Sequence, residues 1–576
     1  MRTVIFIILF SNIMQAQKSK NTLSKDYSFE YREPYFVKNF DTKFRAENNT
    51  HTLEENWGLW GHNIHKFIPI KKAMFSIVNG KINSQQYCFS STQLKTVLEK
   101  AIKNKIKKLP QATKFMIMPN DNHYVCQCNR CKNLGNTETN ASPAVFTLLN
   151  TLAKKFPKLH FFSTAYITTQ TPAPFKLRTN AGVMISTMAF PKGVVIKETN
   201  KLQEVTNTIK NWKKRTCNIY LWDYAINFDN YFEFYPTVLA TQKNLQFYKK
   251  QGITGVFIQG NENAYAAFSN LKCYLYAQLL QNTDVNVESC IKQYFNENYP
   301  LISNILYKYY IKIEQTALKS KRTLPIYGGI QQSFKKYLNE EEFKKFYKQL
   351  QQKIKKTPIQ EQNKIAPLML ALTFQWLEIK RTTTKINENK TKKECITALE
   401  TLLKLQKQTN INTYNEIGKT IKTYNTFWKQ EILHQKEKNL FYNKKFKMLS
   451  QLDEDYPNSN MLNDGLVGFS DYYNNWLLVT KENLKLKIAV SEVKKAKSIE
   501  LCFLDDEKHK IYLPDYVMIS IDKKPIKVKI HQNKNKKNRT KIDIKLQTTN
   551  KEIEIEVFKQ KKFKNNSIAC DEIIFN

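Results

Sequence analysis

The chain has 576 residues, 41% of them apolar and 12% aromatic, so it is long enough for roughly two to four domains and too apolar to be disordered as a whole. Its formal net charge is +41 at pH 7, but only nine of its 91 basic residues are Arg. Proteins that read bases and phosphates favour the bidentate Arg fork, so this Lys-dominated charge does not indicate a nucleic-acid partner. Attraction to anionic glycans or to a cell surface is a secondary expectation.

The first residues predict export. A basic start at Arg2 precedes an apolar run over residues 4–10, and Ala16 offers a small residue for cleavage. We therefore expect a secretory signal peptide over residues 1–16 and a periplasmic or secreted mature protein. No Cys lies near the expected cleavage site, which argues against a lipoprotein, and no later apolar run reaches transmembrane length.

Residues 27–300 alternate short strand-like apolar runs with amphipathic helical patterns. This alternation predicts parallel β-α units, and the number of units predicts a (β/α)8 barrel of the TIM type. The expected strands cover residues 29–31, 115–118, 160–165, 182–188, 218–222 and 255–259, and the expected helices cover residues 92–106, 145–156, 202–214 and 237–250.

Two further zones follow the expected barrel. Residues 301–441 carry apolar positions at helical spacing with almost no Gly, which predicts a helical subdomain packed on the barrel. Over residues 448–576 apolar and polar residues alternate in short runs between turn-rich connectors, which predicts a β-sandwich of the jelly-roll type. The expected fold class is therefore α/β, with a helical region and an all-β region after the barrel.

Three carboxylates stand within a few residues of the ends of strand-like runs, where parallel barrels hold their active sites. They are Asp121, Asp223 and Glu262. Each has a structural alternative: a turn cap for Asp121, a buried orienting group for Asp223 and a helix N-terminal position for Glu262.

Trp60 and His62 lie in a loop that either covers a ligand or anchors an aromatic cluster. Since amides bind sugar hydroxyls and aromatic faces stack on sugar rings, the candidate substrate-binding residues are Trp60, His62, Asn120, Asn122, Tyr166, Trp222, Tyr224 and Gln259.

Cys126, Cys128 and Cys131 follow Asp121 in a CxCxxC spacing, and Cys88 lies in an apolar segment that can approach them. In an exported protein this cluster favours one or two local disulfides as a structural brace. A structural zinc on four thiolates and free buried thiols are the alternatives. The sequence contains no HExxH pair, phosphate-binding loop, dinucleotide fingerprint or nucleophile elbow, so we predict no cofactor and no catalytic metal.

Seven short motifs occur in order along the chain: FEYRE (29–33), GLWGHN (58–63), QYCFSS (86–91), PNDN (119–122) with CQCNRC (126–131), STAY (163–166), WDYAINF (222–228) and GVFIQGNE (255–262). They resemble those of the DUF4838-type barrels, which are similar to glycoside hydrolase family 163, the endo-β-N-acetylglucosaminidases of Bacteroidota that act on N-glycans. The C-terminal zone resembles a galactose-binding-like (discoidin-type) module at LNDG (462–465), Trp476 and the pair Asp571-Glu572.

The resemblance implies a retaining hydrolysis in which the substrate's own acetamido group assists. It implies that one carboxylate orients the acetamido nitrogen, that a second carboxyl group is the general acid, and that the substrate is a glycan containing N-acetylhexosamine. We expect Glu262 to be the acid and Asp223 or Asp121 to be the orienting group, although these roles can be exchanged. A catalytically inactive barrel that only binds glycan is the alternative from another functional class. The resemblance leaves open the sugar, the linkage, endo or exo action, which carboxylate is the general acid and the oligomeric state. It also leaves open whether the C-terminal module binds carbohydrate or is purely structural.

Overall fold

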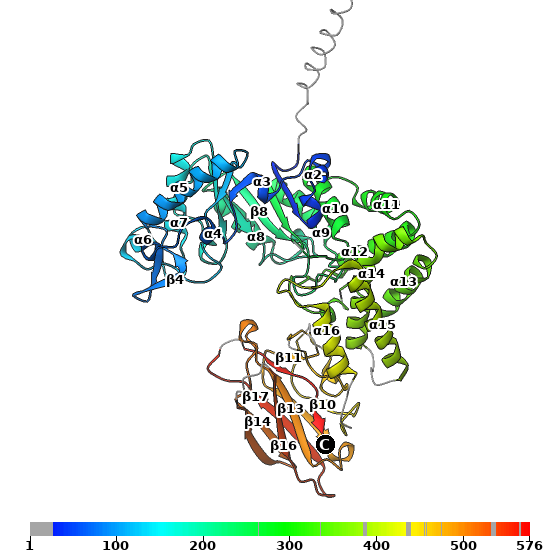
Figure 1. Cartoon of the computed structure of the whole chain (residues 1–576). Helices are drawn as coiled ribbons and strands as arrows, with labels where there is room; N and C mark the ends of the chain where they lie inside the picture. Colours follow the sequence, from blue (N-terminus) through cyan, green and yellow to red (C-terminus); the bar gives the residue numbers. More distant parts are fainter. Residues whose placement is uncertain are drawn as a thin grey trace, which may run out of the picture.

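The computed structural model describes residues 27–576 except residues 263, 335, 384–388, 434–438, 454–455, 457, 470, 474, 532–536 and 564–565. The expected signal peptide over residues 1–16 lies outside the described residues. Figure 1 shows a parallel sheet with its helices, a group of helices beside it and a set of antiparallel sheets below. In the described part of the chain, no helix combines the length and apolarity needed to cross a membrane.

The N-terminal half is built on one curled sheet of seven parallel strands. Along the sheet their order is β1-β9-β8-β7-β6-β5-β2, which is the order of a barrel opened between β1 and β2. The closed eight-stranded barrel that the sequence predicts is therefore not confirmed. The strands are β1 (Tyr31–Tyr35), β2 (Trp57–Leu59), β5 (Lys114–Met116), β6 (His160–Ala165), β7 (Ala181–Ser186), β8 (Ile219–Tyr224) and β9 (Gly255–Gln259).

Two strands differ most from the sequence pattern. β1 runs on through Pro34 to Tyr35, although residues 29–31 are the expected strand. Proline lacks the N–H of a ladder bond, but β1 pairs with β9 alone, and an edge strand tolerates this loss. β2 has only three residues, one of them Gly58, so no alternation is long enough to predict it.

Helices and one hairpin complete this half of the chain. The hairpin of β3 (Phe75–Val78) and β4 (Lys81–Tyr87) lies near α4 and α6 at one end of the sheet (Figure 1). The helices are α2 (Thr42–Asn48), α3 (Leu53–Asn56), α4 (Ile64–Phe67), α5 (Thr92–Lys108), α6 (Asn129–Asn133), α7 (Ser142–Lys155), α8 (Leu202–Lys213), α9 (Val238–Gln251) and α10 (Ser269–Gln281).

Aromatic side chains fill the inside of the curled sheet. Tyr31, Trp57, Phe162 and Tyr220 come from different strands, are almost fully buried and form one cluster. Gly255 allows the ring of Tyr220 to approach, since a Cβ on Gly255 would lie only 2.6 Å from that ring. The inside is therefore a packed core and not a pore.

Hydrogen bonds from the segment before β2, most of them involving side chains, take the place of a strand ladder between β1 and β2. Arg32 N donates to Nδ1 of His51 at 3.1 Å, and His51 N donates to Arg32 O at 2.8 Å. Leu53 N donates to Oε1 of Glu33 at 2.7 Å, and the hydroxyl of Tyr31 donates to the other Glu33 oxygen. Burial raises the pKa of Glu33 well above its ordinary value. The segment before β2 thus satisfies polar groups that lie along the open edge.

The helices that follow pack against this sheet region and share one hydrophobic core with it. They lie to the right of the sheet in Figure 1. They are α11 (Val287–Asn298), α12 (Ser303–Ser320), α13 (Glu340–Ile354), α14 (Ile359–Thr383), α15 (Asn389–Thr409) and α16 (Ile421–Phe427).

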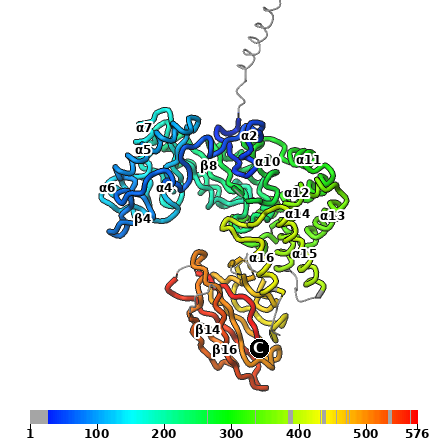
Figure 2. Tube along the Cα trace, in the orientation of Figure 1, coloured from blue at the N-terminus to red at the C-terminus, as the bar shows by residue number. Residues whose placement is uncertain are grey.

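The C-terminal region consists of two antiparallel sheets with a separate core between them. One sheet has the order β10-β12-β17-β14-β15, and the other has the order β11-β18-β13-β16 with β19 beside β13. The chain ends within this region (Figure 2). The strands are β10 (Lys447–Met448), β11 (Leu477–Val479), β12 (Leu484–Ala489), β13 (Ser498–Leu504), β14 (Tyr516–Ile521), β15 (Lys524–Lys529), β16 (Lys537–Asp543), β17 (Glu552–Phe558), β18 (Ile568–Cys570) and β19 (Ile574–Phe575).

A buried arginine fastens this β-rich region to the helices. The guanidinium of Arg381, on α14, donates to Oδ1 of Asn475 at 2.7 Å and lies 4.3 Å from the ring centre of Phe469. The carboxylate of Glu378, one turn earlier on α14, pairs with the same guanidinium. The β-rich region is thus held to α14 by a buried, charged contact.

The His51 contact predicts a pH dependence of stability. Burial, together with the positive charges of Arg32 and Lys114, lowers the pKa of His51 to about 4, whereas an unfolded His titrates near about 6.5. Below pH 6.5 the unfolded state therefore binds the proton more readily, so stability present above that pH is lost as the pH falls toward 4. Between pH 7 and pH 5, the free energy of unfolding should fall about 2 kcal/mol more in the wild type than in His51→Asn.

Chemical denaturation at the two pH values measures this difference. The side-chain amide introduced by His51→Asn keeps an oxygen acceptor for Arg32 N but does not titrate. The exposed His123 provides the matched control, since His123→Asn should keep the wild-type difference. Equal pH dependence in the wild type and His51→Asn would contradict the role of His51.

Candidate functional site

The candidate residues lie where the parallel strands end, on one side of the sheet that we call the carboxyl edge. β5 leads into Asn120, Asp121 and Asn122, and β6 leads into Tyr166. β8 ends in the Trp222-Asp223-Tyr224 segment, and β9 ends at Gln259. Because all seven strands are parallel, residues far apart in the sequence meet along this edge.

One group of side chains surrounds Asp121. Burial and the nearby Asp121 carboxylate raise the pKa of Tyr166 to about 12. The hydroxyl of Tyr224 lies 3.1 Å from Oγ of Ser186. Burial is the main cause that raises the pKa of Tyr224, and the negative charge of Asp121 raises it further. The ring of His62 lies 6.0 Å from that of Tyr166. The structure therefore brings Asp121, Tyr166, Tyr224 and His62 into one group.

The tautomer of His62 follows from its contact. Its Nδ1 lies 2.6 Å from the carbonyl oxygen of Pro119, and a carbonyl oxygen can only accept. Nδ1 therefore carries the hydrogen. This bond also ties the loop after β2 to the start of the loop that carries Asp121.

Asn120 and Asn122 are engaged by the end of β4. Their side-chain nitrogens both donate to the backbone oxygen of Gln85, at 2.8 and 2.9 Å. The side chain of Gln86 donates to Asn120 O at 3.2 Å and to Oδ1 of Asn122 at 3.1 Å. The amides that the sequence predicts as sugar contacts thus shape the loop around Asp121.

Asp223 faces away from the inside of the sheet. Its neighbours on β8, Tyr220 and Trp222, belong to the inner aromatic cluster, and side chains alternate along a strand. Oδ1 of Asp223 lies 3.1 Å from Nζ of the buried Lys192, and Thr187 donates to it at 2.5 Å. Burial lowers the pKa of Lys192, which the charge of Asp223 partly offsets. The structure places Asp223 in a buried ion pair.

Glu262 follows β9 at the carboxyl edge and has partners that the sequence does not predict. The hydroxyl of Tyr35 donates to Oε1 of Glu262 at 3.3 Å and reaches Oε1 of Glu54 at 3.5 Å. The two carboxylate oxygens therefore lie at most about 6.8 Å apart, the sum of these distances. Glu54 belongs to the short α3 and follows no strand, so no periodic signal marks it.

The backbone at Glu262 is also unusual. Its φ is +36°, a left-handed value that strains a residue other than glycine. Strain of this kind concentrates at binding and active sites. The side chain of Glu262 is exposed, as is that of Asp121.

Half-buried indole rings also belong to the carboxyl edge. Nε1 of Trp222 donates to Oε1 of Gln259 at 2.7 Å, so these two candidates are joined. The ring of Trp60 lies 6.5 Å from that of Tyr35. The carboxyl edge therefore combines carboxylates, phenols and indole faces, a set of groups that suits a sugar chain.

The four clustered cysteines differ from the leading expectation. Cys88, Cys126, Cys128 and Cys131 are free thiols, and no disulfide joins them. Their sulfur atoms all lie within 4.8 Å of one another, beside the loop that carries Asp121. The sequence motif identified the cluster, but the structure contains four free thiols in place of the expected disulfides.

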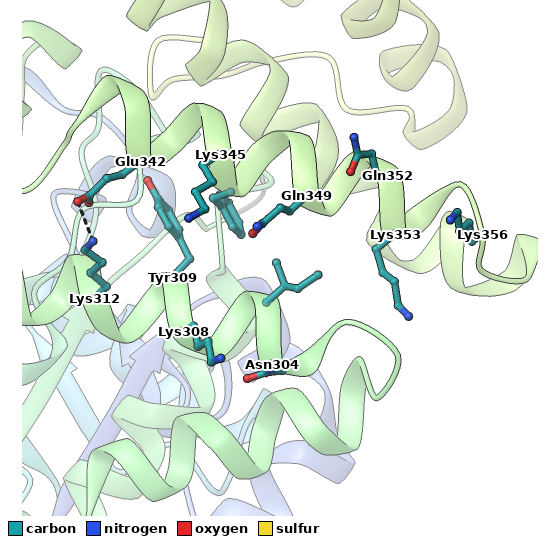
Figure 3. A pocket seen from close by; sticks show the side chains of 12 residues that line it. Asn304, Lys308, Tyr309, Lys312, Glu342, Lys345, Gln349, Gln352, Lys353 and Lys356 are labelled. Atoms are coloured by element: carbon teal, nitrogen blue, oxygen red, sulfur yellow. Dashed lines mark hydrogen bonds and ion pairs between the residues drawn. The ribbon is translucent and has the colours of Figure 1, made fainter.

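A groove lies between α12 and α13 (Figure 3). It has a volume of about 890 Å³ and a largely basic lining that includes Lys308, Lys345 and Lys353. Tyr309 and Phe346 stack in it with ring centres 3.9 Å apart. No residue predicted for the site lines the groove, so it is not the candidate functional site.

Comparisons with known proteins give distant similarities. No curated protein sequence matches the chain. Among solved structures, a family GH115 4-O-methyl-α-glucuronidase with specificity for decorated arabinogalactans aligns over 84% of this chain and 66% of its own, at 10% identity and a TM-score of 0.38. The chain thus spans slightly less than two thirds of that protein.

Two smaller structures align with about a quarter of the chain. The lectin-binding domain of lectinolysin complexed with Lewis b aligns over 24% of this chain and 95% of its own, at 14% identity and a TM-score of 0.17. A CBM51 module of a Clostridium perfringens GH95 protein in complex with methyl-galactose aligns over 25% of this chain and 97% of its own, at 8% identity and a TM-score of 0.16. At these values the similarities establish no activity for this chain.

The sequence comparison with protein families gives a direct result. A family model described as "Domain of unknown function (DUF4838)" matches residues 11–312. This match covers the whole parallel sheet with its carboxyl edge and more than half of the chain. The chain belongs to the DUF4838 family.

Proposed function

We propose that the chain is an exported glycoside hydrolase that cleaves glycans containing N-acetylhexosamine. The observation that carries the proposal is the carboxyl edge, where the carboxylates of Asp121, Glu54 and Glu262 occur with half-buried indole and phenol rings. Hydrolysis of a glycosidic bond needs a proton donor for the leaving oxygen and a group that stabilises charge at the anomeric carbon. Aromatic faces and polar atoms next to such carboxylates suit sugar rings.

In the proposed reaction the substrate supplies its own nucleophile. The carbonyl oxygen of the 2-acetamido group attacks the anomeric carbon while the bond to the leaving oxygen breaks, and Glu262 gives that oxygen its proton. Asp121 accepts a hydrogen bond from the acetamido nitrogen and orients the group. Water then opens the cyclic intermediate and returns a proton to Glu262. This route is similar to that of glycoside hydrolase family 163, which the motifs of the chain resemble.

Asp223 takes a supporting role in this proposal. Its Oδ1 is occupied by Lys192, Thr187 and the backbone N–H of Tyr224, the last at 3.0 Å. This leaves Asp121 as the better placed of the two carboxylates for the acetamido group. Asp223 instead fixes the end of β8, where Trp222 and Tyr224 face the carboxyl edge.

A glycan-binding protein without catalysis is the second candidate. The observation that favours it is the exposure of both Asp121 and Glu262. A general acid that works near neutral pH usually has its pKa raised by burial or by a nearby negative charge. Among the contacts described above, only Glu54, across Tyr35, places a second carboxylate near Glu262. Hydrolysis assays decide between the two candidates.

Glu262→Gln tests the general acid. The variant cannot donate a proton, so kcat on a complex N-glycan or a fluorogenic chitobioside should fall by roughly 100-fold or more, while binding of the glycan stays within a few-fold. Glu204→Gln, on the outer helix α8, is the matched control and should keep wild-type activity. Near-full activity of Glu262→Gln would remove Glu262 from the reaction. A wild type that binds glycan without releasing product would favour the second candidate.

A substrate pair tests the assisted route. A fluorogenic cellobioside has a 2-hydroxyl group where the chitobioside has a 2-acetamido group. The assisted mechanism requires that acetamido oxygen, so the cellobioside should be hydrolysed at least about 100-fold more slowly. Comparable rates on both substrates would contradict the assisted mechanism and would point to a protein carboxylate as the nucleophile.

Asp223→Asn tests the supporting role. The change leaves Lys192 buried without a negative partner, which should lower the free energy of unfolding by about 3 kcal/mol. The double variant Lys192→Met/Asp223→Asn removes the unpaired charge and should recover most of this loss, together with most of the activity. A double variant that is stable but at least about 100-fold less active would show that Asp223 acts on the substrate.

A further inference from the structure

Cysteines from two separate segments meet beside the loop that carries Asp121. Cys88 follows β4, whereas Cys126, Cys128 and Cys131 lie between β5 and the end of α6. Three of the four are buried and Cys128 is half-buried. Residues nearly 40 positions apart therefore place four sulfur atoms in one cluster, all within 4.8 Å of one another.

The distances between the sulfur atoms match a tetrahedral metal site. Sγ of Cys88 lies 3.7 Å from Sγ of Cys128 and 3.8 Å from Sγ of Cys131. Four thiolates at about 2.3 Å around one zinc ion lie about 3.8 Å apart at tetrahedral angles. A disulfide would instead bring two sulfur atoms to about 2.05 Å and separate the cluster into pairs.

The surroundings supply hydrogen bonds suited to thiolates. The backbone N–H of Ile77 donates to Sγ of Cys126 at 3.3 Å, and that of Cys131 donates to Sγ of Cys128 at 3.5 Å. Oγ of Ser90 lies 3.1 Å from Sγ of Cys131 and 3.3 Å from Sγ of Cys88. Such second contacts orient sulfur ligands and stabilise their negative charge.

We propose that Cys88, Cys126, Cys128 and Cys131 bind one Zn²⁺ ion as thiolates. Each thiol gives up its proton as its sulfur–zinc bond forms, and no electron is transferred. All four coordination positions come from the protein, so the site is closed to substrate and is structural. Zinc does not change its oxidation state, which suits a site whose only task is to hold two segments together.

The proposed zinc site fastens the β3–β4 hairpin to the loop that carries Asp121. Next to it, Gln127 N donates to Ile77 O at 2.7 Å. The backbone oxygen of Gln85 and the side-chain amide of Gln86 hold Asn120 and Asn122 through hydrogen bonds. The metal and these amides act on the same two segments. The metal site stands on its own geometry and does not depend on the proposed hydrolase activity.

Metal analysis of the full chain tests the proposal. Protein purified without chelators should contain about one zinc ion per chain by elemental mass spectrometry. Titration of four thiols with a mercurial reagent should release this zinc in proportion to the thiols that have reacted. Cys128→Ser and Cys126→Ser should each lower the zinc content at least about five-fold under equal free zinc. The exposed Cys217 lies outside the cluster, so Cys217→Ser is the matched control and should keep the wild-type content.

A second measurement needs no variant and therefore does not depend on the folding of the serine proteins. In the wild type the four thiols should resist alkylation until a chelator removes the metal, and exchange with Co²⁺ should give the visible absorption of tetrahedral thiolate cobalt. A chain without metal, a chain that carries iron in place of zinc, or a mass lowered by two hydrogens for each disulfide would overturn the proposal.

Discussion

The open edge between β1 and β2 is the constraint on which the rest of the sheet region depends. A curled parallel sheet that does not close leaves backbone donors and acceptors along two edges, and a buried unpaired group costs about 1–3 kcal/mol. Here His51 exchanges two hydrogen bonds with Arg32, and the buried Glu33 accepts the N–H of Leu53. Aromatic rings, including the edge-to-face pair of Tyr31 and Trp57 at 5.8 Å, fill the space inside.

The hydrogen bonds along the open edge also position part of the candidate site. Leu53 begins α3, and the next residue, Glu54, reaches the hydroxyl of Tyr35, which in turn contacts Glu262 from the far end of the sheet. Burial of Glu33 at the base of this chain raises the pKa of its carboxyl group well above the ordinary value. The contacts that hold the edge together and those that place two carboxylates near each other are therefore continuous.

The loops of the carboxyl edge also depend on the rest of the chain. The segment after β8 exchanges backbone bonds with the helical region, from Tyr231 N to Tyr414 O at 2.8 Å and from Glu416 N to Phe228 O at 2.9 Å. Burial and the nearby Asp471, from the β-rich region, raise the pKa of Asp229 to about 6. Parts that the sequence predicts as separate zones thus meet beside the loop after β8, which links their packing to the site.

The sequence by itself determined the alternating elements, the β-rich C-terminal region and the family, because periodicity and short motifs are local properties. It also brought attention to Asp121, Glu262 and the cysteines, since each follows a strand or keeps a fixed spacing. Consecutive side chains of a strand point to opposite faces of the sheet, so a shift of one position moves a side chain to the other face. For this reason only the tertiary structure decided that Asp223 faces Lys192. It also revealed Glu54 and the four-sulfur arrangement, since both require segments that meet only when the sheet curls and its loops pack.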